Sequence, residues 1–89
     1  MIHPSAIVSS NAEIHPDAYI GPWCIVEDNV KIASGVRLEA RVRVVSCTEI
    51  GENTKVGPNA YIRPDSVIGK NARIGDFVEI KKSNIEYAN

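Results

Sequence analysis

The stretch that determines the fold is residues 50–74, IGENTKVGPNAYIRPDSVIGKNARI. Within it an aliphatic residue recurs at every sixth position, at Ile50, Val56, Ile62, Ile68 and Ile74. A period of six fits neither an α-helix, which repeats every 3.6 residues, nor a lone amphipathic strand, which repeats every 2. It indicates a short strand followed by a tight corner in each repeat.

The same spacing runs through almost the whole chain. The aliphatic series also includes Ile2, Val8, Ile14, Ile20, Val26, Ile32, Leu38, Val44 and Ile80. Four positions after each aliphatic residue from Ile2 to Ile74 stands a small or β-branched one, expected to point inward as well. The position just before each of these small or β-branched residues is rich in residue types that tolerate a left-handed backbone. The expected left-handed corners are Asn11, Asp17, Asn29, Gly35, Asn53, Asn59, Asp65 and Asn71.

Three such strands complete one triangular turn, so each repeat lies under the third repeat after it, and the chain has room for four to five turns. The predicted fold is therefore all-β and single-domain: a triangular solenoid of hexapeptide repeats, that is, a parallel β-helix, over residues 1–82. At Glu86 the aliphatic spacing ends. We expect residues 83–89 to form a C-terminal cap or a frayed tail.

Composition narrows the class of protein. Ten Lys and Arg residues against 11 Asp and Glu give a net charge of -1, which argues against nucleic acid as a partner. No apolar run is long enough to span a membrane, and the first residues do not resemble a signal peptide. Two cysteines without a C-x-x-C spacing suggest neither a disulfide framework nor a zinc site, so a cytoplasmic location is expected.

Two family resemblances cover different halves of the chain. Residues 1–45, with IHPSAIV at 2–8 and YIGPWCIV at 19–26, resemble the UDP-N-acetylglucosamine O-acyltransferases. Residues 50–85, with IRP at 62–64 and GDFVEIKKS at 75–83, are similar to the acetyltransferase domain of the bifunctional N-acetylglucosamine-1-phosphate uridyltransferases. The resemblance implies a left-handed sense for the β-helix. Two signatures joined in phase suggest a chimeric or designed chain, and a natural truncated homologue is the alternative.

Both families use a histidine as general base, and that histidine lies beyond the segments that match here. We therefore expect no catalytic residue and no catalytic activity. His3 and His15 each precede a proline, which is typical of a corner, and are expected to be surface residues. Two histidines on different faces cannot form the three-histidine zinc site known on this fold, so no metal site and no cofactor are expected.

The candidate binding residues are Arg63 and Lys81. They are one full turn apart in the sequence and should stack about 4.8 Å apart on neighbouring coils. Two cations so close would suit an anion such as a diphosphate. The uridyltransferase resemblance implies that both contact a sugar nucleotide, here as a vestigial site with at most weak affinity. The alternative is that both are solvated and partly neutralised by Glu79 or Glu27.

Other outward columns have simpler interpretations. Arg37, Lys55 and Arg73 form a second basic column above Tyr19, expected to aid solubility. Exposed apolar residues usually mark association. Here they form two columns: Ile7, Ile25 and Tyr61, interrupted by Arg43, and Val67 with Ile85. Both resembled families are trimers, so self-association as a homotrimer is expected. Cys24 should be buried and Cys47 exposed.

Two functions remain open at this point. The first is an engineered or truncated structural β-solenoid without catalytic activity. The second is a fragment of a sugar-nucleotide acyltransferase that retains part of a UDP-N-acetylglucosamine or glucosamine-1-phosphate site through Arg63 and Lys81.

Overall fold

The computed structural model describes residues 1–75 and, by their backbone alone, residues 79–80 and 84–85. Its regular elements are two-residue strands at six-residue intervals, with a shorter last interval. They are β1 (Ile7–Val8), β2 (Glu13–Ile14), β3 (Tyr19–Ile20), β4 (Ile25–Val26), β5 (Lys31–Ile32), β6 (Arg37–Leu38), β7 (Arg43–Val44), β8 (Glu49–Ile50), β9 (Lys55–Val56), β10 (Tyr61–Ile62), β11 (Val67–Ile68), β12 (Arg73–Ile74), β13 (Glu79–Ile80) and β14 (Asn84–Ile85).

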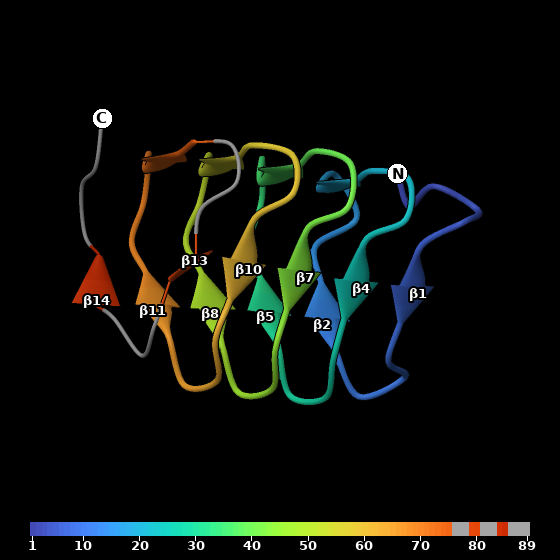
Figure 1. The fold of residues 1–89 in the computed structure, drawn as a ribbon, viewed down its shortest axis with the longest axis horizontal. Helices are drawn as coiled ribbons and strands as arrows, with labels where there is room; N and C mark the ends of the chain where they lie inside the picture. The colour runs from blue at the N-terminus through green and yellow to red at the C-terminus, as the bar shows by residue number, and fades with distance from the viewer. Residues whose placement is uncertain (76–78, 81–83, 86–89) are drawn as a thin grey trace.

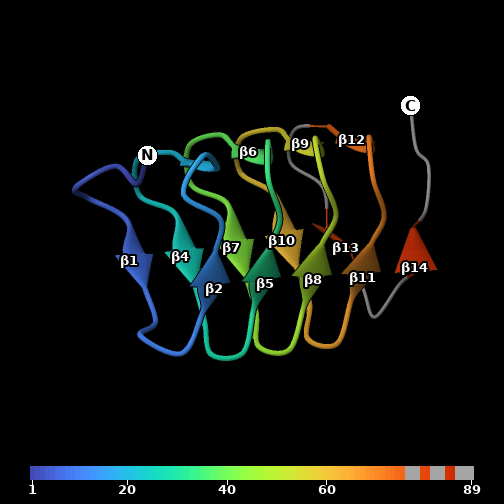
Figure 2. The ribbon, with the colours of Figure 1, turned by 180° about the vertical axis from the view of Figure 1, so that it is seen from behind.

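Each strand from β1 to β11 pairs in parallel with the strand three elements later, as Figure 1 and the opposite view in Figure 2 show. Three sheets result: β1-β4-β7-β10-β13, β2-β5-β8-β11-β14 and β3-β6-β9-β12. The register is one full turn of three hexapeptides, for example Ile20 opposite Leu38 and Leu38 opposite Val56. The predicted left-handed parallel β-helix is confirmed.

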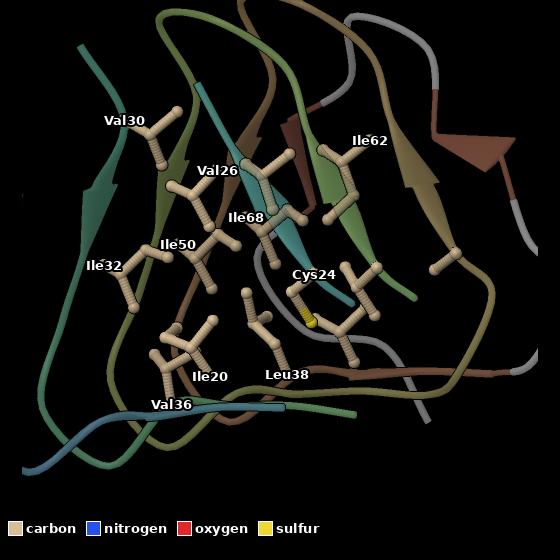
Figure 3. Packing of buried hydrophobic residues seen from close by; sticks show 14 of the residues in the cluster. Ile20, Cys24, Val26, Val30, Ile32, Val36, Leu38, Ile50, Ile62 and Ile68 are labelled. Carbon is tan, nitrogen blue, oxygen red and sulfur yellow. The ribbon is translucent and has the colours of Figure 1, made fainter. Parts of the chain in front are cut away.

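The aliphatic residue of each strand from β1 to β12 points into the prism, and Figure 3 shows many of these side chains packed together. Ile20, Leu38, Val56 and Ile62 are 0% exposed. Small and β-branched residues such as Cys24 fill the space beside them, as expected. The coils bury their apolar side chains only by stacking on one another, so stability grows with each added coil.

Three polar residues also lie in this core: Thr48, Thr54 and Ser66. Each hydroxyl donates to a main-chain carbonyl, Thr54 to Gly69 at 2.7 Å, and Thr48 and Ser66 to Arg63 at 3.1 and 2.8 Å. No buried side-chain nitrogen or oxygen within the described residues lacks a partner. These three hydroxyls are therefore paired with the backbone at the corners, and they leave no unpaired polar group of their own in the core.

The corners depart from the sequence prediction at five positions. Left-handed backbone occurs at Asn29, Gly35, Asn53, Asn59, Asp65 and Asn71, as predicted, but not at Asn11 or Asp17. It also occurs at three residues whose side chains do not favour it, Trp23, Arg41 and Cys47.

The coil underneath explains the difference. At a left-handed corner the N–H donates to an oxygen of the preceding coil. The acceptor is a carbonyl at most corners, for example Asp28 for Cys47 at 3.1 Å, and a side-chain oxygen at Trp23 and Gly35. The first coil has no coil below it. Its corners close instead by a local turn, in which Ala12 N–H donates to Ser9 at 3.1 Å and Ala18 N–H to His15 at 2.9 Å. Hydrogen bonding between coils, and not residue preference alone, thus selects the left-handed corners.

The last strand corrects a second prediction. Val67 lies opposite Asn84, and Ile68 lies opposite Ile85, so the expected outward column of Val67 with Ile85 is wrong. The interval between these partners is one position shorter than a full turn, because β14 begins one position early. The backbone register thereby places Ile85 opposite Ile68. The domain boundary at residues 82 and 83 lies outside the described residues and stays a prediction.

Within the described part of the chain, no helix has the length and apolar character needed to cross a bilayer.

Candidate functional site

Arg63 lies just after β10, at the start of a corner, and its side chain is exposed. Its carbonyl accepts the hydroxyls of Thr48 and Ser66, so the backbone under the guanidinium is anchored from two sides. Lys81, the second predicted site residue, lies outside the described residues. The preceding strand keeps the register of one full turn, with Ile62 opposite Ile80. The stacking of Lys81 on Arg63 stays a prediction.

Two arginines flank one aromatic ring beside this corner. The guanidinium carbon of Arg43 lies 5.8 Å from the centroid of the Tyr61 ring, and that of Arg63 lies 6.0 Å from it. Both distances are within the range of a cation–π contact. Sequence reasoning did not connect Tyr61 and Arg43 with the site. The available signal was their separation by three repeats, which makes them direct neighbours on β10 and β7.

Glu27 balances one of these cations. Its carboxylate oxygen Oε2 accepts from Arg43 Nη2 at 2.6 Å and from Nε at 2.9 Å, and Ser46 Oγ lies 3.4 Å from Oε1. The hydrogen bonds and charge of Glu27 raise the pKa of the Arg43 guanidinium. Glu27, which the sequence offered as a counterion for Arg63, is therefore engaged by Arg43. The pair orients Arg43 along the outer face.

Both histidines serve corners. His3 Nδ1 lies 2.8 Å from Ser5 Oγ and accepts the Ser5 N–H at 3.1 Å. His15 Nδ1 lies 2.8 Å from Asp17 Oδ1 and 3.2 Å from the Asp17 nitrogen. These contacts confirm the corner role. Among the described residues, no group of three or more His, Cys, Asp or Glu side chains is arranged to hold a metal ion.

The two cysteines differ as predicted. Cys24 is 0% exposed, and its thiol donates to the carbonyl of Glu39 at 2.9 Å. Burial raises the pKa of the Cys24 thiol, which keeps it protonated and unreactive. Cys47 is exposed at a left-handed corner, and both thiols are free.

The sheet of β2, β5, β8 and β11 carries a shallow groove of about 840 Å³ on its outer side that the sequence did not indicate. Lys31 lies there directly between Glu13 and Glu49, so charges of opposite sign alternate from strand to strand across the sheet. Small residues such as Ala33 and Gly51 follow the strands and leave the groove open.

The predicted basic column forms, but on the strands of the β3-β6-β9-β12 sheet and not at a corner, where we expected it. Arg37 lies opposite Lys55, and Lys55 lies opposite Arg73. At its N-terminal end the Arg37 guanidinium covers the Tyr19 ring at 4.3 Å and pairs with Glu39 at 2.5 Å.

The hexapeptide repeats also match a known family. The model of the bacterial transferase hexapeptide family, six repeats long, matches residues 1–44 and 47–82. The chain belongs to this family.

Individual relatives agree with the first of the two resemblances. The chain is 60% identical, over 47 residues, to an acyl-[acyl-carrier-protein]–UDP-N-acetylglucosamine O-acyltransferase of Psychrobacter sp. (strain PRwf-1), and 49% identical over 47 residues to the one of Thermodesulfovibrio yellowstonii. Each match covers 53% of this chain and 18% of the relative. The chain thus spans about a fifth of the length of these relatives.

Solved structures show the same fold. The UDP-N-acetylglucosamine acyltransferase of Bacteroides fragilis superposes on 100% of this chain with a TM-score of 0.89 at 24% identity, over 42% of its own length. The Arabidopsis UDP-N-acetylglucosamine acyltransferase covers 89% of this chain with a TM-score of 0.73 at 30% identity, over 29% of its length. These findings favour the acyltransferase interpretation over the engineered solenoid. The uridyltransferase resemblance and the chimeric origin stay predictions.

Proposed function

We propose that this chain is a coil segment of a sugar-nucleotide acyltransferase and supplies part of the site for a UDP-N-acetylglucosamine-like substrate. The observation that carries the proposal is the 60% identity to a relative described as a UDP-N-acetylglucosamine O-acyltransferase, on a matching solenoid. The identity extends over 47 residues, which is 53% of this chain.

Arg63 is the residue that would bind the diphosphate. Guanidinium groups donate in a planar fork that matches phosphate oxygens, and charge-assisted hydrogen bonds are the strongest kind. Arg63 is exposed, and its backbone is anchored by two buried hydroxyls, so binding an anion there orders little more than one side chain. Lys81 would add a second cation one coil further on, as the uridyltransferase resemblance implies.

Acyl transfer itself needs a general base near the acceptor hydroxyl. His3 and His15 lie at corners, where their Nδ1 atoms contact Ser5 and Asp17, and we assign neither of them this role. The part of the reaction that we assign to the described residues is therefore substrate binding, and the affinity of this segment by itself should be weak.

The test is calorimetric titration with UDP-N-acetylglucosamine of the wild type, Arg63→Ala and Arg63→Lys. Loss of a charge-assisted hydrogen bond should weaken binding about tenfold or more in Arg63→Ala, and less in Arg63→Lys. Arg41→Ala is the matched control, since Arg41 is another exposed corner arginine. The proposal fails if the wild type does not bind the sugar nucleotide, or if Arg41→Ala weakens binding as much as Arg63→Ala.

We also propose that the chain self-associates, with a homotrimer as the expected state, through the outer face of the β1-β4-β7-β10 sheet. Ile7 is 66% exposed there and lies directly opposite Ile25. Burying these side chains against another copy would remove apolar surface from water. Ile25→Asp should shift the mass found by light-scattering chromatography towards that of one chain. An unchanged mass, or a wild type that is monomeric at all concentrations, would refute this interface. A cytoplasmic location stays a prediction from the sequence.

A further inference from the structure

The outer face of the β3-β6-β9-β12 sheet concentrates positive charge in a way that the net charge of -1 does not suggest. The register places Arg37, Lys55 and Arg73 directly across from one another on three adjacent strands. The next residue of each strand is buried in the core, so the three cations point outward. At the spacing of parallel strands, the column is about 10 Å long.

Like charges directly opposite one another destabilise a sheet. Comparable cations on the other two sheets are balanced: Lys31 lies between two glutamates, and Arg43 is held by Glu27. On the basic column only the first member is balanced, by Glu39 at 2.5 Å. Lys55 and Arg73 have no ion pair among the described residues.

The local sequence keeps carboxylates away from the upper part of this column. Glu39 follows β6, but the equivalent positions after β9 and β12 are Gly57 and Gly75, which have no side chain. At the corner leading into β12, Lys70 adds a further exposed cation, with Glu52 at 3.6 Å as its partner. An anion can therefore approach Lys55 and Arg73 without meeting a competing acid on the strands.

From this arrangement we infer that the basic column, Arg37, Lys55 and Arg73, is a binding site for linear oligophosphates, meaning chains of linked phosphate groups. Arginine and lysine are the side chains that bind phosphate oxygens, the first as a fork and the second as a point charge. A straight row of cations along the solenoid axis matches a linear ligand better than a compact monoanion. This site is on a different face from Arg63 and does not depend on the proposed function.

The experiment is a titration with inorganic tripolyphosphate, pyrophosphate and monophosphate at constant ionic strength. Affinity should rise with chain length, because a longer ligand spans more of the column. Lys55→Gln and Arg73→Gln should each weaken tripolyphosphate binding about tenfold. Lys31→Gln is the matched control: it removes a strand lysine of the same exposure class but with acidic neighbours, and it should leave binding unchanged.

Melting of the ligand-free variants gives a second, independent readout. Lys55→Gln relieves repulsion on both sides and should raise the melting temperature, whereas Lys31→Gln removes two attractions and should lower it.

A nucleoside triphosphate is included to distinguish the source of the phosphates: it should bind like tripolyphosphate if only the phosphate chain is recognised, and markedly tighter if a nucleotide is the occupant.

Three results would overturn the inference: no binding by the wild type, equal affinity for monophosphate and tripolyphosphate, or equal losses in Lys31→Gln and Lys55→Gln. Tighter binding of duplex DNA than of tripolyphosphate would also overturn it, since the face would then attract any polyanion.

Discussion

Replacing the two unfavourable corner residues Arg41 and Cys47 by asparagine should stabilise the protein. Both have left-handed backbone, with φ of 60° and 64°. Both are exposed, and neither side chain makes a hydrogen bond or ion pair within the described residues. The corner hydrogen bonds come from backbone N–H groups, to Pro22 at 2.9 Å and to Asp28 at 3.1 Å, and survive the substitution.

The expected gain follows from backbone energetics. The left-handed conformation costs an ordinary L-residue roughly 1–2 kcal/mol, and asparagine visits it far more readily. We therefore expect about 1 kcal/mol of added stability for each of Arg41→Asn and Cys47→Asn. An unfolding entropy of about 2.1 cal/mol/K per residue makes 1 kcal/mol worth about 5 °C in a chain of this size. The double variant should gain about twice that, because the two residues share no partner.

The assay is thermal denaturation followed by circular dichroism at a fixed protein concentration, since association would also raise the melting temperature. Asn11→Gly is the control. Asn11 occupies the equivalent corner in the first coil but does not have positive φ, so glycine should cost about 0.5–1 kcal/mol there. If both asparagine variants melt at or below the wild-type temperature, the argument that these corners store strain is wrong.

Three further outcomes are expected. Gly51→Ala should destabilise the fold by about 1–3 kcal/mol, because an added Cβ would lie 2.7 Å from the backbone carbon of Gly69. Chemical denaturation measures this loss. A variant as stable as the wild type would show that the two coils can move apart at this position. Asp17→Asn should lower the melting temperature at neutral pH. The N–H of Gly35 and the hydroxyl of Ser34, on the next coil, hold the pKa of Asp17 below its usual 3.8. The stability that the Asp17 carboxylate adds to the fold is therefore present above pH 3.8 and is lost as the pH falls through the lower pKa of the folded state. The difference between Asp17→Asn and wild type should therefore shrink in acid, and a constant difference would contradict the assignment. A thiol reagent should label Cys47 quickly and Cys24 only after unfolding; two fast thiols in the native protein would show that the core opens around Cys24.

Much of the candidate site could be located from the sequence, but not its electrostatics. The six-residue period placed Tyr61 and Arg43 in one outward column, and the structure confirms that they are neighbours on β10 and β7. The pairing of Glu27 with Arg43 joins residues on a diagonal between coils, which the period does not imply. That diagonal gives Arg43 its carboxylate partner.

The sequence by itself determined the coil and its core. The aliphatic residue at every sixth position identifies the inward side chain of each repeat, because burial of apolar surface stabilises every repeat in the same way. The sequence also predicted six of the left-handed corners, and the tertiary structure decided the remaining corners and the pairing of the last strand. Asn11 and Asn29 are the same residue type at equivalent positions, yet only Asn29, which has a coil beneath it, has left-handed backbone. Likewise β14 pairs one residue out of period. Both outcomes depend on hydrogen bonds to a neighbouring coil. The backbone preference of a single residue does not depend on that coil and so cannot predict either outcome.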